Sequence, residues 1–274
     1  MVGSLLLVAT PLGNLGDLSR RAAEALARAD VVACEDSRRA AKLLAHLGLA
    51  KPLVLYADYN ERAAAEKLIR RLMDGATVAL VTDAGSPLVA DPGFELVRRA
   101  LARGVAVEAV PGPSAVHVAL ALSGLPPYPY AFLGYLPRKA AERRAFLARW
   151  AALPMTRVVF VTPHRVAAEL ADLRDAWGDV DVALGRELTK VHEEVLRGPV
   201  TDVINKVAAR GVLKGELTLV ARGAAAAAGD EALPRAVALA RELVGAGVPP
   251  AKAAAVAAKS CGAAKEDIYR ALTG

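Results

Sequence analysis

Short apolar runs that end in Gly- and Pro-rich turns alternate with helical stretches along the first 124 residues of the chain. The clearest example is residues 78–93, where Val-Ala-Leu-Val is followed by Thr-Asp-Ala-Gly-Ser-Pro and then by Asp91-Pro92-Gly93. An apolar run of this length, bounded by turn residues, is typical of a buried strand in a parallel sheet. Strands that alternate with helices predict an α/β fold, with a mostly parallel sheet and helices on both faces.

The Pro-rich segment 124–129 predicts a domain boundary, because prolines this dense stop both helix and strand. A second α/β unit follows it, then an Ala-rich linker over residues 223–229 and a small helical tail over 233–274. The predicted domains are 1–124, 125–223 and 230–274. Strands are expected at 5–9, 31–34, 53–56, 78–81 and 105–110, and then at 132–135, 158–161, 182–184 and 216–221.

Composition narrows the class of protein without identifying it. A formal charge of +6 and a pI near 9.4 suit a polyanionic partner, but solvated basic helix faces explain them equally well. The two cysteines, Cys34 and Cys261, form no C-x-x-C pair, which disfavours zinc and disulfide frameworks. No apolar stretch reaches the length of a membrane span, and the N-terminus lacks a basic signal region. We therefore expect a soluble cytoplasmic protein without a metal.

The tail carries two helical patterns on either side of Cys261-Gly262. They are compatible with a helix-turn-helix that contacts nucleic acid. They are equally compatible with a helical pair that only covers the core, and both interpretations stay open.

Polar and small residues follow several of the expected strands, where open α/β sheets bind their ligands. The turns Asp83–Pro87 and Pro111–Ala115 could line one cleft, and Gly85 would let backbone approach a ligand closely. Two ordinary strand-to-helix turns are the alternative. The Gly-rich loop at 10–17 matches neither G-x-G-x-x-G nor a P-loop, so neither phosphate motif applies.

Two adjacent carboxylates, Glu35 and Asp36, end the second expected strand. Such residues are candidates for acid–base or positioning work. The alternative is that Asp36 or Ser37 only caps the helix that follows.

In this order, the segments Asp83-Ala84-Gly85-Ser86-Pro87, Asp91-Pro92-Gly93 and Pro111-Gly112-Pro113-Ser114-Ala115 resemble the tetrapyrrole methylase superfamily. Three more segments resemble its ribosomal RNA methyltransferases, namely residues 9–17, Glu35-Asp36-Ser37-Arg38, and 186–190 with Glu193-Glu194. One segment departs from the pattern. The subgroup usually carries a Glu just before His164-Arg165, whereas this chain has Thr162-Pro163 there, so no role of that carboxylate is carried over.

The resemblance implies two α/β domains with a cofactor cleft between them, plus a small helical C-terminal extension. It implies S-adenosylmethionine as methyl donor and, as acceptor, a cytidine ribose 2′-hydroxyl in 16S ribosomal RNA of the small subunit. It also implies a homodimer, and neither a metal nor a membrane. The alternatives are a methylase of a corrin or porphyrin precursor on the same fold, and a non-catalytic RNA-binding assembly factor.

The resemblance and the strand-end argument together give three sets of candidate site residues. The expected cofactor contacts are Leu12, Asp83, Gly85, Ser86, Leu88, Ser114, Ala115, Phe160, Leu184 and Glu216. The catalytic candidates are Asp36, Glu35 and Lys190, with Asp36 preferred as the base that activates the hydroxyl. The expected RNA contacts are Asn14, Arg38, Arg39, Arg138, Lys139, Arg143 and Arg144.

Overall fold

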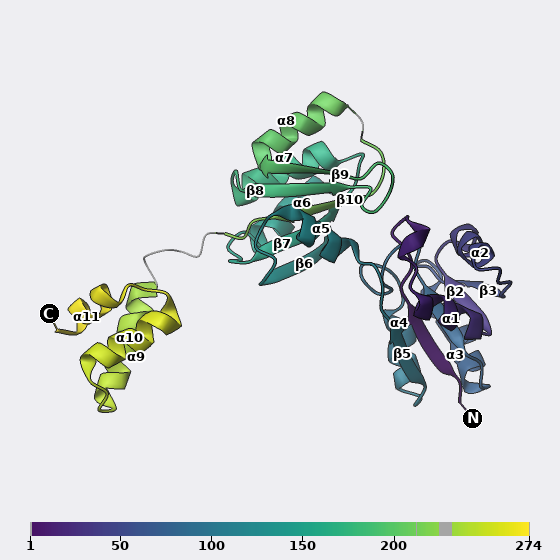
Figure 1. Ribbon diagram of the computed structural model, residues 1–274, viewed down its shortest axis with the longest axis horizontal. Helices are drawn as coiled ribbons and strands as arrows, with labels where there is room; N and C mark the ends of the chain where they lie inside the picture. The colour runs from purple at the N-terminus through teal and green to yellow at the C-terminus, as the bar shows by residue number, and fades with distance from the viewer. Residues whose placement is uncertain (1, 212, 225–231, 274) are drawn as a thin grey trace. The chain divides into compact units, whose positions relative to one another are not determined.

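The computed structural model describes residues 2–211, 213–224 and 232–273. The chain divides into two compact units, Met1–Trp150 with Met155–Arg222, and Ala151–Pro154 with Gly223–Gly274. The larger unit holds two five-stranded sheets, and Figure 1 labels most of their strands. We call β1–β5 with α1–α4 the first lobe, and β6–β10 with α5–α8 the second lobe.

The first lobe is built on a parallel sheet, as predicted. Its strand order is β3-β2-β4-β1-β5, and every described pair is parallel. The carboxyl ends of these strands therefore lie along one edge. The strands are β1 (Ser4–Val8), β2 (Val31–Cys34), β3 (Leu53–Leu55), β4 (Val78–Val81) and β5 (Ala106–Val110). The helices are η1 (Leu15–Asp17), α1 (Arg20–Arg28), α2 (Ser37–His46), α3 (Glu61–Met73) and α4 (Phe94–Leu101).

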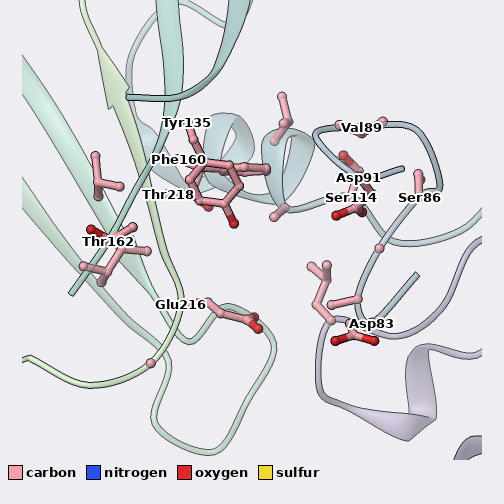
Figure 2. Close-up of a pocket in the computed structure, with 18 of the residues that line it drawn as sticks. Asp83, Ser86, Val89, Asp91, Ser114, Tyr135, Phe160, Thr162, Glu216 and Thr218 are labelled. Carbon is pink, nitrogen blue, oxygen red and sulfur yellow. The ribbon is translucent and has the colours of Figure 1, made fainter. Parts of the chain in front are cut away.

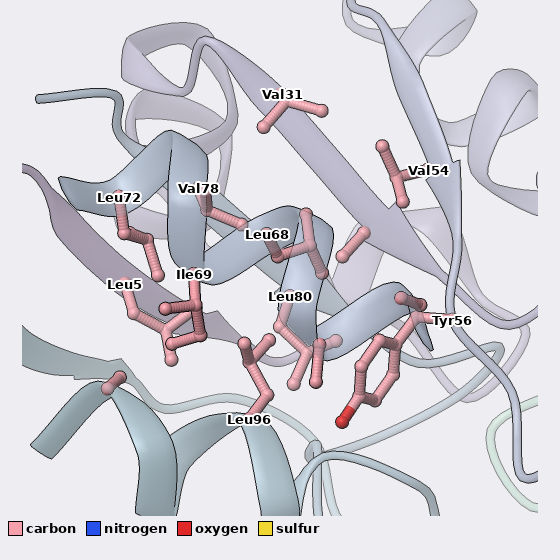
Figure 3. Close-up of a cluster of buried hydrophobic side chains, with 14 of the residues drawn as sticks. Leu5, Val31, Val54, Tyr56, Leu68, Ile69, Leu72, Val78, Leu80 and Leu96 are labelled. Carbon is pink, nitrogen blue, oxygen red and sulfur yellow. The ribbon is translucent and has the colours of Figure 1, made fainter. Parts of the chain in front are cut away.

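The core of the first lobe follows from the two-residue period of its strands. Leu5 of β1 packs in the cluster of α3 and α4, with Leu68 and Leu96 (Figure 3). The next residue, Leu6, packs in the cluster of α1 and α2, with Leu26. Burying each such leucine contributes roughly 1.5–3 kcal/mol. Both faces of the sheet are thus covered, and the strand-end loops remain for a site.

The second lobe corrects the expectation of a mostly parallel sheet. Its order is β6-β7-β10-β8-β9; only β6 and β7 pair in parallel, and the other three pairs are antiparallel. Strand β9 was not predicted, since its sequence ends in Gly-Pro; it follows β8 after a short turn, which suffices for antiparallel pairing. The strands are β6 (Tyr130–Tyr135), β7 (Thr156–Val161), β8 (Asp181–Arg186), β9 (Glu194–Pro199) and β10 (Leu217–Ala221). The helices are α5 (Ala115–Ser123), α6 (Ala140–Arg149), α7 (Val166–Trp177) and α8 (Val200–Arg210).

Helix α5 precedes the predicted boundary at residue 124 but belongs to the second lobe by packing. Its residues Val116 and Leu120 lie in one buried cluster with Val158 of β7 and Val220 of β10. The predicted domain limits remain a prediction, and this packing favours a division in the loop between β5 and α5.

The smaller unit contains the expected helical tail, as α9 (Ala232–Gly245), α10 (Pro250–Cys261) and α11 (Lys265–Thr273). Its core consists largely of small side chains, among them Ala236, Ala253 and Ala257, around Ile268. Most of the predicted linker, residues 225–229, lies outside the described residues. Over the described ranges, the search for a helix with the length and apolar character of a membrane span finds none.

Candidate functional site

A cavity of about 330 Å³ lies among strand ends of both lobes (Figure 2). The first lobe contributes the loops that follow β1, β2, β4 and β5. The second lobe contributes the ends of β6 and β7 and the start of β10, which meet because β7 and β10 are antiparallel, with Leu217 opposite Val161. The lining residues are Leu12, Glu35, Arg39, residues 83–86, Val89, Asp91, residues 114–116, Tyr135, residues 160–163 and residues 215–218.

The turn after β4 is held against two neighbouring loops. Gly85 exchanges backbone hydrogen bonds with Thr10, at 2.8 and 3.1 Å. The Ser86 hydroxyl donates to the Pro113 carbonyl at 3.4 Å. Gly85 has φ +84°, and a Cβ there would stand 3.2 Å from Leu12. The turn therefore requires glycine, and its backbone borders the cavity without a side chain.

In the segment between this turn and α4, neighbouring side chains lie on different sides of the backbone. Leu88 and Ala90 both adopt left-handed backbone, with φ 70° and 67°, which is strained for residues that carry a Cβ. Val89 and Asp91 line the cavity, whereas Leu88 packs against the core of the first lobe. The Leu88 side chain therefore does not line the cavity, Val89 is the neighbour that does, and the predicted contact of Leu88 with the cofactor stays a prediction.

Of the ten expected cofactor contacts, eight line the cavity, namely Leu12, Asp83, Gly85, Ser86, Ser114, Ala115, Phe160 and Glu216. Their role as contacts stays a prediction. Leu184 does not line it, because it lies buried in β8 between Leu219 and Leu196 of the flanking strands. The sequence interpretation missed Tyr135, Thr162 and Thr218. Tyr135 ends a predicted strand, so the strand-end rule used in the first lobe would have found it.

The cavity is acidic. Burial, then the negative charges of Glu35 and Asp83, raise the pKa of Asp91 to about 7. The pKa of Glu35 is also raised, first by burial and then by the negative charge of Asp83. Within the described part of the chain, no hydrogen bond or ion pair reaches the carboxyl group of either residue. Arg39 lies 3.5 Å from the Asp83 carboxylate and 3.9 Å from that of Glu216, and the Lys190 ammonium lies closer to Glu216, at 3.1 Å.

Asp36 does not line this cavity and serves as the N-cap of α2. Its carboxylate accepts the Arg38 backbone N–H at 2.8 Å and pairs with the Arg38 guanidinium at 2.7 Å. These hydrogen bonds from the Arg38 side chain and backbone lower the pKa of Asp36. A carboxylate held this way is a weak base, so the geometry supports the helix-cap interpretation over the preferred catalytic one.

Lys190 lies at the edge of the same site, between two carboxylates. Its Nζ donates to Glu187 at 2.9 Å and to Glu216 at 3.1 Å. Burial opposes its charge, but the hydrogen bonds and charges of Glu187 and Glu216 prevail and raise the pKa of Lys190. It therefore stays protonated and cannot accept a proton. A side chain at Gly13 would collide with Lys190, so the loop after β1 approaches this lysine closely.

The cations proposed for RNA binding fall into two groups. Arg143 is only 4% exposed and pairs with Asp172, which corrects its assignment: it is structural and cannot reach a phosphate. Asn14 caps η1 by accepting the Gly16 N–H at 3.0 Å. The side chains that remain exposed are Arg38, Arg39, Arg138, Lys139 and Arg144. Among the residues with described positions, no three His, Cys, Asp or Glu side chains are placed to hold a metal ion.

Comparison with known proteins relates the chain to methyltransferases. The sequence pattern of the family Tetrapyrrole (Corrin/Porphyrin) Methylases matches residues 4–204. Ribosomal RNA small subunit methyltransferase I of Xylella fastidiosa strain Temecula1 is 43% identical, over 97% of this chain and 98% of its own. The protein of that name from Pseudomonas aeruginosa is 40% identical, over 98% and 96%.

Solved structures share the fold at low identity. Diphthine synthase superposes with a TM-score of 0.62 at 18% identity, over 81% of this chain and 90% of its own. Uroporphyrin-III C-methyl transferase from Thermus thermophilus, complexed with S-adenyl homocysteine, gives 0.58 at 22%, over 80% and 97%. The chain thus belongs to the tetrapyrrole methylase family and, within it, to the family of ribosomal RNA small subunit methyltransferase I.

Proposed function

We propose that this chain transfers a methyl group from S-adenosylmethionine to the 2′-hydroxyl of a cytidine ribose in 16S ribosomal RNA of the small subunit. The observation that carries the proposal is its nearly full-length similarity, at about 40% identity, to proteins named ribosomal RNA small subunit methyltransferase I. Methylases of corrin and porphyrin precursors share the fold at identities near 20%.

The residues of the cavity fit the methyl donor. S-Adenosylmethionine combines an adenosine with a methionine chain that carries positive charges on its sulfonium and amino groups and a negative charge on its carboxylate. Leu12, Val89 and Phe160 offer apolar walls, and the acidic residues Asp83 and Glu35 favour the cations. The bare backbone at Gly85 leaves room for close contact. When bound, the donor supplies an electrophilic methyl group.

The chain itself must orient the acceptor hydroxyl and take its proton, since a neutral hydroxyl is a poor nucleophile. Asp91 replaces Asp36 in this role. It lines the cavity, its carboxyl group has no fixed partner among the described residues, and its pKa near 7 suits proton transfer at neutral pH. The neighbouring carboxylates favour the protonated form of Lys190, and Asp36 caps a helix, so the geometry favours Asp91 over both.

RNA binding, oligomeric state and location belong to the same proposal. The exposed cations Arg38, Arg39, Arg138, Lys139 and Arg144 would contact phosphates of 16S ribosomal RNA in the small subunit. A homodimer would cover apolar surface on α4, where Phe94 and Leu101 are 70% and 60% exposed. We place the protein in the cytoplasm, with its ribosomal substrate.

The decisive experiment is transfer of a labelled methyl group to purified small ribosomal subunits, followed by mapping of the modified nucleotide. We expect label on a cytidine ribose of 16S ribosomal RNA. Label on a corrin or porphyrin precursor instead would make the chain a precursor methylase. RNA binding without any transfer would make it an assembly factor. Light scattering of the purified protein would test the dimer.

A further inference from the structure

A second cavity, of about 290 Å³, lies entirely within the first lobe. It is enclosed by the loop after β1, one face of α2 and the end of β4. Pro11, Leu15 and Leu43 give it apolar walls, and Arg39 and Lys42 stand at its border. Of the residues expected to bind the donor, Asp83 alone lines this second cavity, and Asp83 lines the first cavity as well.

The two cavities are neighbours with a common edge. Arg39 and Asp83 line both. Elsewhere the loop after β1 separates them, with Leu12 in the first cavity and Pro11 and Gly13 in the second. That loop is fixed by the Thr10–Gly85 backbone pair. The Thr10 hydroxyl also donates to the Thr82 carbonyl, at 3.2 Å. The two cavities therefore adjoin at Asp83 and Arg39.

Of the two cations at this border, Arg39 makes only long ion pairs and Lys42 makes none within the described ranges. Arg39 lies 3.5 Å from Asp83 and 3.9 Å from Glu216, which is beyond a good charge-assisted hydrogen bond. Lys42 is exposed, and within the described ranges its ammonium group has no hydrogen-bond or ion-pair partner. An occupant with a flat apolar part and a phosphate would satisfy both the walls and the border.

We propose that the second cavity receives the nucleobase of the acceptor nucleotide, turned out of the RNA strand. Its ribose then lies at the shared edge, next to the donor cavity, and its phosphate lies near Lys42. Unstacked bases of single-stranded RNA can be splayed out into protein pockets, and enzymes that modify a base bind it in this way. This inference rests on the proposed function, because it assumes that the acceptor is RNA.

The test changes the walls without touching the donor site. Leu15 is 46% exposed, so Leu15→Asp makes the pocket polar at little risk to folding. Lys42→Glu reverses the border charge. The matched controls are Met73→Asp, at the exposed last residue of α3, and Lys67→Glu, at an exposed lysine on the same helix; both residues lie outside the two cavities. We expect each test variant to weaken binding of small subunits about tenfold, with donor affinity by calorimetry and melting temperature unchanged, and the controls to match the wild type.

A double-mutant cycle, which combines the Leu15→Asp variant with an altered RNA, tests directly whether the base occupies the second cavity. Small subunits would be reconstituted with 16S ribosomal RNA that carries an abasic ribose at the nucleotide methylated by the wild type. Removing the base should weaken wild-type binding about tenfold, and should weaken Leu15→Asp binding hardly at all, because the contact is already lost. Fully additive losses would overturn the proposal, as would unchanged binding of both variants or a parallel loss of donor affinity.

Failure of the function and failure of this inference give different results. If the wild type methylates no RNA, the proposed function falls and this inference falls with it. If the wild type methylates the small subunit while Leu15→Asp and Lys42→Glu bind like the controls, the function stands and only the pocket assignment is wrong.

Discussion

The two lobes contribute to the same cavity by different geometries. In the first lobe every described strand pair is parallel, so the loops after β1, β2, β4 and β5 meet at one edge and supply most of the polar lining. In the second lobe most pairs are antiparallel, so neighbouring strands present opposite ends. The second lobe reaches the cavity with the ends of β6 and β7, the start of β10 and the first residues of α5. The difference suggests that the first lobe carries the chemistry and that the second completes the walls.

The largest effect is expected in the first lobe, from Asp91→Asn. If Asp91 takes the hydroxyl proton, the single-turnover rate should fall by about two to four orders of magnitude at unchanged donor affinity. The wild-type rate should rise with pH through about 7 as the carboxyl group loses its proton, and the variant should show no such rise. The acids that face Asp91 are Glu35, Asp83, Asp58 and Glu216, all of which raise its pKa.

A matched variant separates Asp91 from its neighbour Glu35. Glu35→Gln removes one of those acids, so it should lower the midpoint of the pH profile and keep activity. A loss of activity in Glu35→Gln but not in Asp91→Asn would make Glu35 the base.

The pH dependence of stability gives a second test of Asp91. Because the folded pKa of Asp91 is about 7 and the reference value 3.8, the wild type loses stability as pH rises between these values. The amide cannot ionise, so Asp91→Asn should resist denaturant better than the wild type above pH 7.

The same contrast explains how much of the fold could be predicted from the sequence. Strands β2 and β4 were placed at the residues observed, because a four-residue apolar run buried on both faces has one simple interpretation. In the second lobe, β9 reads E-V-L-R-G-P and carries no such run. Its pairing with β8 depends on tertiary contacts, and so does the antiparallel direction of the sheet.

Site residues were predictable where the backbone itself constrains the sequence. Gly85 was predicted because a strand followed by a turn with Gly and Pro marks the ligand edge of a sheet, and it does line the cavity. The choice between Leu88 and Val89 depends on the left-handed backbone at Leu88, which no short pattern reveals. The sequence singled out Asp36 because it follows a strand directly, whereas Asp91 lies well beyond the end of β4 and was not a candidate. Only the structure separates them, since Arg38 engages one and like charges surround the other.

The next effect concerns the turn that borders the donor cavity. Gly85→Val places a branched side chain at φ +84° and within 3.2 Å of Leu12, so donor affinity by calorimetry should fall about 10- to 100-fold. Gly48→Val is the matched control. Gly48 has φ +67° with no atom within 4 Å of its added Cβ, so that variant carries similar strain but should bind the donor normally. Equal losses of affinity in both would remove Gly85 from the site.

A smaller effect is expected at Asp36, although it is adjacent to the cavity residue Glu35. Asp36→Ala removes the cap of α2 and should lower the free energy of unfolding by about 1 kcal/mol, whereas Asp36→Asn retains a capping side chain. Both variants should keep the single-turnover rate within a few-fold of wild type. A rate loss of two orders of magnitude in Asp36→Asn would return the catalytic role to Asp36 and contradict the role of Asp91.

The smallest effect is expected in the second lobe, from Arg144→Ala. The Arg144 side chain is 68% exposed and donates to Asp172 at 2.9 Å, while Arg143 occupies the buried side of the same carboxylate. If Arg144 contacts one RNA phosphate, its loss should weaken binding a few-fold and reduce the slope of log affinity against log salt by about 0.7. Arg149→Ala, at an exposed arginine near the other end of α6, is the control for net charge.

Arg143→Ala is no test of binding, since it would leave Asp172 without its buried partner and destabilise the lobe. Equal slopes for Arg144→Ala, Arg149→Ala and the wild type would show that this helix face is only solvated. The second lobe would then contribute walls to the donor cavity and, from α6, no RNA contact.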